Sequence, residues 1–268
     1  MAQDTRPDLA ALTRLDGRGI VVLGVGPGIG GATARLLAAA GAKLLCVDRD
    51  EGQARATAEA VGGEPYAADI TDRAQMQALF ARAESLFGDS FYGVADIVGV
   101  GKHGEIEAFD DADIDRILAL NFRHALLVTQ IAGPMLAARG RGTLVFVSSL
   151  AGSVVAPDQP IYGMAKGALQ QMVRYAAHEY GPRGVRTNAV APALTLTPGL
   201  RARLSPAAIA ECEARTPLRR CAEPEDMANT IYYLTADLSS YINGSTINVD
   251  GGIMTGANLP STRQLQAV

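Results

Sequence analysis

Residues 19–48 read GIVVLGVGPGIGGATARLLAAAGAKLLCVD, and this stretch decides the fold. It opens with a short apolar run typical of a buried strand, and it closes with a second apolar run, KLLCVD, that ends in an acid. Between the two runs, a glycine-rich turn leads into an alanine- and leucine-rich segment that predicts a helix. Strand, turn, helix and strand in this order predict a βαβ unit, in which the two strands are parallel.

The turn of this unit has the parts of a dinucleotide site. Gly24, Gly28 and Gly30 allow a tight turn and let a pyrophosphate approach the helix N-terminus, where free N–H groups favour anions. Asp48 stands where a carboxylate accepts hydrogen bonds from a ribose diol and repels a 2′-phosphate, so it favours NAD over NADP. The neighbouring Arg49 leaves an alternative open, because a guanidinium can hold a 2′-phosphate; a solvated surface arginine is the plainer interpretation.

The rest of the chain continues the alternation. Helical stretches are expected at 53–61, 74–87, 114–138 and 224–236, and strands at 64–69, 93–98, 144–147, 184–190 and 246–249. Such alternation predicts an α/β fold, a doubly wound parallel sheet with helices on both faces (the Rossmann fold). We expect one domain at 17–256, between an N-terminal tail at 1–16 and a C-terminal tail at 257–268.

A second chemical signal lies at 142–169. An apolar strand ends at Ser149, and the helical segment after it carries Tyr162 and Lys166, four residues apart and so on one helix face. A nearby ammonium stabilises a phenolate, and moving the phenol pKa from ~10 to about 7 needs roughly 4 kcal/mol. Ser149 could then hold an oxygen while Tyr162 moves its proton. The alternative is that Tyr162 and Lys166 are an ordinary pair of helix residues without a catalytic role.

The expected topology brings these two signals together. Ligands of such sheets bind outside the carboxyl ends of the strands. The residues that follow expected strand ends should therefore line one crevice with Tyr162 and Lys166: the glycine turn, Asp48, Asp69, Gly99 and Ser149. A nicotinamide in that crevice could take or give a hydride while Tyr162 moves the proton.

Composition excludes several classes of function. Hydrophobic residues make up 48% of the chain and charged residues 19%, and the net charge of −4 comes without a basic cluster, which argues against a nucleic-acid partner. Cys46, Cys212 and Cys221 lack metal-ligand spacing, so we expect reduced cytosolic thiols and no metal. Without a signal peptide or a run of ~20 apolar residues, a soluble cytoplasmic protein is expected.

Over about residues 16–254 the chain resembles the short-chain dehydrogenase/reductase family. The matching motifs occur in the family's order: GVGPGIG at 24–30 for TGxxxGxG, Asn121 in LNFRHALLVTQ, SSLAG at 148–152, YGMAK at 162–166, VRTNAVAPALTLTP at 185–198 and PEDMANTIYYLTADLSSYINGSTINVDGG at 224–252. Ser149 stands thirteen positions before Tyr162, the usual family spacing.

This resemblance implies roles for single residues. Tyr162 would be the general acid/base, Lys166 would lower its pKa and hold the nicotinamide ribose, and Ser149 would bind the substrate oxygen. Asn121 would support a proton-relay water through its helix. Asp69 and Ile70 would lie at the adenine and Thr197 near the carboxamide. Together with Tyr162 and Lys166, the cofactor would contact Gly24, Gly28, Ile29, Gly30, Asp48, Arg49, Asp69, Ile70, Gly99, Pro192, Thr195 and Thr197.

Three positions depart from the family pattern. Leu23 stands where threonine is usual, and Ala193 replaces the glycine of a Pro-Gly pair. Residues 96–99, Asp-Ile-Val-Gly, replace Asn-Asn-Ala-Gly, so polar contacts must be rebuilt there, with Asp96 as a plausible substitute. His103 could face the pocket, although a surface histidine is the plainer interpretation, and His124 and His178 receive no role.

The expected function is an NAD-dependent oxidoreductase that interconverts a hydrophobic secondary alcohol, cyclic or aromatic alcohols included, and its ketone. The apolar loop at 154–157 favours such a substrate, and 198–216 matches the family's mobile lid, with Leu200, Leu204 and Ile209 as its apolar cover. Two alternatives stay open: an NADPH-dependent 3-oxoacyl reductase and a non-catalytic nucleotide-sensing scaffold. The resemblance also implies a homotetramer.

Overall fold

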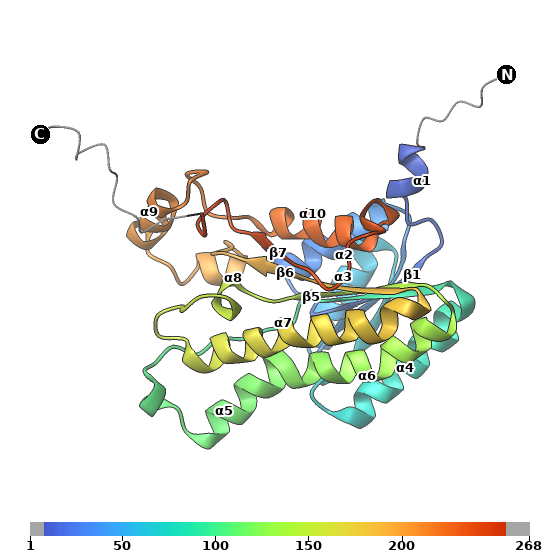
Figure 1. Cartoon of the computed structure of the whole chain (residues 1–268), viewed down its shortest axis with the longest axis horizontal. Helices are drawn as coiled ribbons and strands as arrows, with labels where there is room; N and C mark the ends of the chain where they lie inside the picture. The colour runs from blue at the N-terminus through green and yellow to red at the C-terminus, as the bar shows by residue number, and fades with distance from the viewer. Residues whose placement is uncertain (1–7, 256–268) are drawn as a thin grey trace, which may run out of the picture.

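The computed structural model describes residues 8–255, and Figure 1 shows their arrangement. The expected C-terminal tail at 257–268 and the first seven residues of the expected N-terminal tail lie outside this range. The described part of the N-terminal tail forms a short helix, α1 (Leu9–Thr13), which begins at Asp8, whose carboxylate accepts a hydrogen bond from the backbone N–H of Ala11.

The predicted parallel sheet is confirmed. Seven strands pair in the order β3-β2-β1-β4-β5-β6-β7, all of them parallel. The strands are β1 (Gly19–Leu23), β2 (Lys43–Asp48), β3 (Glu64–Ala67), β4 (Phe91–Asp96), β5 (Gly142–Val147), β6 (Val185–Pro192) and β7 (Thr246–Val249). The order reverses between β1 and β4, and the carboxyl ends of these two strands are where such sheets bind ligands.

Helices cover both faces of the sheet, seen nearly edge-on in Figure 1. One face carries α2 (Ile29–Ala39), α3 (Glu51–Val61) and α10 (Pro224–Thr235), and the other carries α4 (Arg73–Phe87), α6 (His124–Ala138) and α7 (Pro160–Tyr180). The shorter helices are α5 (Asp111–Leu118), α8 (Pro198–Arg201) and α9 (Pro206–Arg215). Single turns of 3-10 helix are η1 (Gly88–Ser90), η2 (Ile106–Ala108), η4 (Leu150–Gly152), η5 (Gly181–Arg183) and η6 (Asp237–Ser239).

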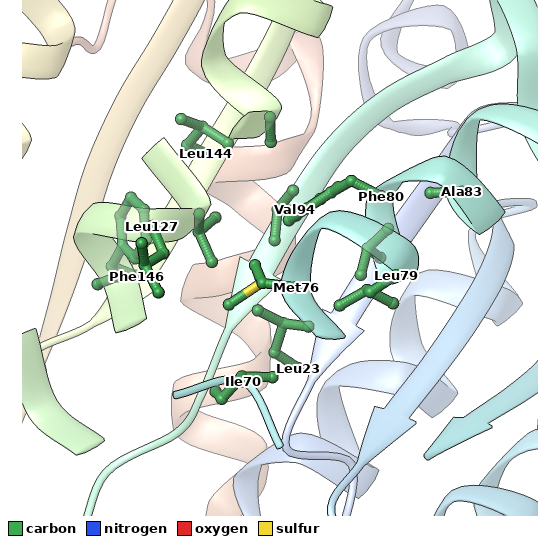
Figure 2. Packing of buried hydrophobic residues seen from close by; sticks show 14 of the residues in the cluster. Leu23, Ile70, Met76, Leu79, Phe80, Ala83, Val94, Leu127, Leu144 and Phe146 are labelled. Atoms are coloured by element: carbon green, nitrogen blue, oxygen red, sulfur yellow. The ribbon is translucent and has the colours of Figure 1, made fainter. Parts of the chain in front are cut away.

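The central strands β1, β4 and β5 are largely apolar because both of their faces are buried. Alternate residues of β1 point to opposite sides: Val21 and Leu23 pack beneath α4 and α6, whereas Ile20 and Val22 pack beneath α2 and α10. Figure 2 shows the first of these clusters, where Met76, Leu79 and Phe80 of α4 meet the side chains of the strands. This rigid sheet holds the strand ends that carry the site.

One expected helix is divided by a π-helical turn. In place of a continuous helix over 114–138, α5 is followed by η3 (Ala119–Arg123) and then α6. Within the turn the Asn121 amide donates to the carbonyl oxygen of Ile117 at 2.9 Å, and the backbone N–H of His124 bonds Ala119, five residues back. Side-chain hydrogen bonding therefore competes with the α-helical ladder here, which helical periodicity alone does not reveal.

Several strand boundaries also differ from the expectation by about two residues. β3 ends at Ala67, so Asp69 lies in the loop beyond the strand, and β4 begins two residues earlier than expected and ends at Asp96. None of the helices within residues 8–255 is long and apolar enough to cross a membrane.

Candidate active site

The glycine turn after β1 requires glycine at each of its key positions. Gly24 and Gly28 have φ of +81° and +133°, which side chains rarely adopt. A Cβ on Gly30 would lie 1.8 Å from the carbonyl oxygen of Gly24. No side chain caps the N-terminus of α2, which begins at Ile29. The N–H of Gly31 donates to the Gly26 carbonyl, whereas those of Ile29 and Gly30 have no acceptor among the described residues and can bind an anion.

The close contact at Gly30 gives a testable consequence. In Gly30→Ala the new methyl group overlaps backbone that cannot move away, and we expect a loss of about 1–3 kcal/mol in the free energy of unfolding. Thermal unfolding should then begin about 2–12 °C lower, and dinucleotide binding should weaken. Gly101→Ala is the matched control, since a Cβ there meets nothing within 4 Å. Equal melting temperatures for the two variants would contradict the packing argument.

Asp48 is held against this turn from the end of β2. Its Oδ2 accepts a hydrogen bond from the backbone N–H of Gly26 at 3.0 Å, and its Oδ1 accepts one from Asp50 at 3.1 Å. The half-buried carboxylate is thereby fixed at the mouth of the turn. Arg49 is exposed beside it.

Asp69 and Ile70 lie beyond the end of β3 and differ in exposure. The backbone N–H and hydroxyl of Thr71 both donate to Asp69 Oδ1, at 2.9 and 2.6 Å, and these hydrogen bonds hold the pKa of that carboxyl below its usual value. The charge of Arg49 acts in the same direction. The Ile70 side chain instead packs in the core beside Leu23, as Figure 2 shows.

The segment after β6 closes over the same turn. Pro192 ends the strand and is buried, and the buried Thr195 hydroxyl donates to the carbonyl of Ala193 at 3.2 Å. Thr197 caps α8, and its Cγ2 lies 3.1 Å from where a Cβ on Gly28 would be. The start of the expected lid is thus placed against the anion-binding turn.

Ser149 follows β5 with its hydroxyl arranged to donate. Its Oγ accepts the backbone N–H of Ala151 at 3.2 Å, which leaves the hydroxyl hydrogen for another acceptor. The loop after it packs tightly on α7: a Cβ on Gly152 would lie 2.8 Å from the backbone of Lys166, and one on Gly163 would lie 2.9 Å from the Ala151 carbonyl oxygen. This packing brings Ser149 to Tyr162.

Tyr162 and Lys166 meet at this point on one face of α7, as their spacing predicts. Burial raises the pKa of the Tyr162 phenol above its usual value, and a hydrogen bond with Ser149 opposes the rise. The Lys166 ammonium lies 5.7 Å from the centre of the Tyr162 ring and donates to the carbonyl of Val147 at 2.8 Å. Lys166 is 1% exposed, and burial lowers its pKa to about 8.

Asn121 joins the π-helical turn to the loop after β4. Its Oδ1 accepts the backbone N–H of Val100 at 3.1 Å, and its Nδ2 donates to the Val100 carbonyl at 2.7 Å. Gly99 packs between Asn121 and Lys166, because a Cβ there would lie 3.0 Å from the Asn121 Oδ1 and 2.9 Å from the Lys166 Nζ. The predicted catalytic residues therefore gather at the carboxyl ends of β4 and β5.

Two residues of this region escaped sequence reasoning. Gln170 Nε2 donates to Ser148 Oγ and to the Ser149 carbonyl, both at 3.1 Å, and so holds the end of β5 against α7. The imidazole of His124 is buried against Asp96. No sequence motif identifies Gln170. The only sequence signal for the contact between His124 and Asp96 is the unusual aspartate at position 96.

The remaining expected positions lie on the surface or in the core. His103 is exposed and reaches Gln159 at 3.2 Å, just before α7. Within the segment expected to form the lid, Arg201 pairs with Glu223 at 2.6 Å and Arg215 pairs with Glu211 at 2.7 Å. Leu23 is fully buried in the core.

Comparison with known proteins agrees with this geometry. Residues 24–254 match the family model described as "Enoyl-(Acyl carrier protein) reductase". Over 250 residues the chain is 34% identical to 2-(S)-hydroxypropyl-CoM dehydrogenase 3 of Xanthobacter autotrophicus, covering 90% of this chain and 98% of that protein. The chain is a short-chain dehydrogenase/reductase. The resemblance drawn from the motifs is confirmed.

Two solved structures of related proteins contain a nicotinamide dinucleotide. A 7α-hydroxysteroid dehydrogenase complexed with NADH and 7-oxo glycochenodeoxycholic acid matches with a TM-score of 0.86 at 28% identity, covering 91% of this chain and 96% of that one. A gluconate 5-dehydrogenase from Burkholderia cenocepacia, in complex with NADP and tartrate, matches with a TM-score of 0.85 at 26% identity. The match covers 92% of this chain and 98% of that one. This short-chain dehydrogenase/reductase is an NAD(P)-dependent oxidoreductase acting on CH–OH groups.

The residues of this short-chain dehydrogenase/reductase fit a nicotinamide dinucleotide. The glycine turn presents backbone without side chains, and the N-terminus of α2, which no side chain caps, favours a pyrophosphate. Asp48 suits a ribose diol. These features lie along the same edge of the sheet as Ser149, Tyr162 and Lys166.

Proposed function

We propose that this chain is an NAD-dependent dehydrogenase that interconverts a hydrophobic secondary alcohol, cyclic or aromatic alcohols included, and its ketone. The observation that carries the proposal is the convergence of the Ser149 hydroxyl, the Tyr162 phenol and the buried Lys166 ammonium at one strand end. These three groups supply what carbonyl and alcohol chemistry needs: a donor to oxygen, an acid/base, and a charge that tunes it.

Each of the three groups has a separate task. In alcohol oxidation the Ser149 hydroxyl donates to the substrate oxygen, while the Tyr162 phenolate accepts its proton. The Lys166 ammonium stabilises the phenolate, because an opposite charge nearby favours the ionised form. When bound, the nicotinamide supplies the hydride acceptor. We propose that Asn121 supports the proton relay by holding the π-helical turn against the loop that carries Gly99.

The choice of NAD over NADP rests on Asp48. Its carboxylate is fixed at the glycine turn by the N–H of Gly26, where it would accept hydrogen bonds from a free ribose diol and repel a 2′-phosphate. In this arrangement Asp69 and the backbone of Ile70 would contact the adenine, and Pro192, Thr195 and Thr197 would contact the nicotinamide end.

The hydrophobic substrate class rests on the apolar loop between Ser149 and Tyr162. Val154 and Val155 of this loop are 44% and 91% exposed, which leaves apolar surface uncovered beside the catalytic residues. The expected lid carries Leu200, Leu204 and Ile209, all half-buried. A nonpolar ring or chain between the two would cover both surfaces.

A substrate panel tests the proposal. We expect reduced cofactor to accumulate when the chain is mixed with NAD and ring or aryl alcohols such as cyclohexanol and phenylethanol. Hydrophilic hydroxy acids and hydroxyacyl thioesters should turn over at least about tenfold more slowly, since one or two lost apolar contacts cost about 1–3 kcal/mol. Turnover confined to the charged or thioester substrates would contradict the proposed substrate class.

One observation keeps the NADPH-dependent 3-oxoacyl reductase as a second candidate. Arg49 is exposed directly beside Asp48, so its guanidinium is free to reach a 2′-phosphate. Such an enzyme would use NADPH and a 3-oxoacyl thioester, and the same panel run in the reducing direction separates the two candidates.

We further propose that the enzyme works as a cytoplasmic homotetramer. Met164 and Tyr175 of α7 are 58% and 62% exposed, an apolar surface that a second copy would cover. The three cysteines are free thiols, as expected in a reducing compartment. Light scattering of the purified chain measures the assembly.

A further inference from the structure

Three ionisable side chains are buried together at the carboxyl end of the sheet. Asp96 ends β4, His124 begins α6 and Lys166 lies on α7, and they are 2%, 1% and 1% exposed. The group therefore contains one acid and two bases. Because an unbalanced buried charge is costly, a single carboxylate can balance only one of the two cations at a time.

The contact between Asp96 and His124 is direct. The Nε2 atom of His124 lies 3.0 Å from Asp96 Oδ2 and 3.3 Å from Oδ1. The backbone N–H of Val98 also donates to Oδ1 at 3.1 Å, whereas no other donor among the described residues reaches Oδ2. The carboxylate is thus aimed at the imidazole.

The contacts of the other ring nitrogen of His124 indicate that the Asp96–His124 pair can bind one additional proton. Nδ1 of His124 lies 3.2 Å from the carbonyl oxygen of Ala119, in the π-helical turn that carries Asn121. Both ring nitrogens therefore face oxygen atoms, but a neutral imidazole has only one N–H. All contacts are satisfied only when the pair holds one more proton, and the pair is then neutral. Without that proton it carries one negative charge.

Lys166 reaches the neighbouring strand beside this pair: Asp96 pairs with Phe146 in the sheet, and the Lys166 ammonium donates to the carbonyl of the next residue, Val147. Burial lowers the Lys166 pKa to about 8, and the negative charge of Asp96 opposes this decrease. The neighbouring strands β1 and β5 contain no ionisable side chain, and α7 faces this region with Tyr162 and Lys166. Arg123 in the π-helical turn and Arg116 in α5 are exposed to solvent, and Asp113 of α5 pairs with Lys102.

We propose that Asp96 and His124 form a positioning pair that shares one buried proton with Lys166 and so sets whether Lys166 is charged when Tyr162 exchanges its proton. Two arrangements leave the group neutral: a charged Lys166 beside the deprotonated pair, and a neutral Lys166 beside the protonated pair. The pair also joins the end of β4 to the turn that carries Asn121. The inference rests on the proposed roles of Tyr162 and Lys166.

Nitrogen-15 spectra of the histidine side chains test the sharing without any substrate. The chain has three histidines, and His124→Gln identifies the signals of His124. In Lys166→Met the competing cation is gone, so at neutral pH the His124 signals should show both ring nitrogens protonated in a larger share of the molecules than in the native chain. Identical His124 signals in the two proteins would overturn the proposal.

Two further variants test the same point by kinetics. Asp96→Asn keeps the shape, because its amide can donate to Nε2 while Nδ1–H donates to Ala119 and Oδ1 still accepts from Val98. It removes the charge that supports Lys166, so the rising limb of kcat for alcohol oxidation should move about one pH unit higher, with an about tenfold loss near neutral pH. In His124→Gln the imidazole no longer competes with Lys166 for the negative charge of Asp96. The rising limb of kcat should therefore move to lower pH.

Opposite shifts in these two variants separate an electrostatic role from a structural one. If the pair only held the fold together, both variants would lose kcat equally at every pH, and that result would overturn the proposal. If Tyr162→Phe remained active, the proposed function would fail first. If Tyr162→Phe were inactive but Asp96→Asn and His124→Gln kept the native pH profile, the proposed function would stand and only the role of the Asp96–His124 pair would be overturned.

Discussion

Tyr162→Phe should oxidise the secondary alcohols that the native chain accepts about a hundredfold to ten thousandfold more slowly in kcat, while reduced dinucleotide still binds. The loss is this large because a positioned acid/base contributes about that factor, and phenylalanine keeps the ring but has no proton to exchange. Ser149 and Lys166 then remain in place without the group they serve. Steady-state kinetics, together with cofactor fluorescence for binding, measures both parts.

A tyrosine on the same helix provides the control. Tyr175 is 62% exposed and far from the strand ends, so Tyr175→Phe should keep native kcat and native thermal stability. Equal activity in Tyr162→Phe and the native chain would show that the proton leaves by another route and that the acid/base assignment is wrong.

The second large effect is expected in cofactor choice. Asp48→Asn should raise kcat/KM for NADP relative to NAD by about tenfold to a hundredfold. A carboxylate about 5 Å from a phosphate is repelled by about 1–3 kcal/mol at a protein surface, and asparagine removes this repulsion. Its side-chain oxygen can still accept the N–H of Gly26, so the turn should keep its shape. Initial rates with both cofactors measure the ratio.

The chain offers a matched control two residues away. Asp50 caps α3 through the N–H of Gln53, and asparagine caps a helix equally well, so Asp50→Asn removes a nearby charge without changing the turn. Its cofactor ratio should remain native. A native chain that prefers NADP, and loses this preference in Arg49→Ala, would show that Arg49 outweighs Asp48.

Most of the fold could be predicted because its signals are local. The apolar runs of β1 and β2, the glycines between them and the acid after β2 are contiguous in the chain, and their order determines a parallel βαβ unit. The boundaries were less accurate where side chains compete with the backbone. Helical periodicity continues through 114–138, and nothing in it marks the π-helical turn at Asn121.

The residues of the candidate site also divide into those that local sequence predicts and those that it does not. Tyr162 and Lys166 are four residues apart on one helix, and Ser149 ends a strand, so each of these positions could be read from its neighbours in sequence. Gln170 could not, because its role is to hold the Ser148–Ser149 strand end, which lies twenty-one and twenty-two residues earlier in the chain. That contact exists only once α7 packs against β6 and against the turn η4 that follows β5.

The sequence by itself therefore determined the parallel sheet, the glycine turn for a dinucleotide and the proposed catalytic set of Ser149, Tyr162 and Lys166, because these depend on periodicity and short spacing. Only the tertiary structure decided where Asp96 and His124 lie. They are twenty-eight residues apart and meet because β4 is a central strand and α6, which begins at His124, packs against it. Burial then makes their charge important to Lys166, since the interior screens it far less than water does.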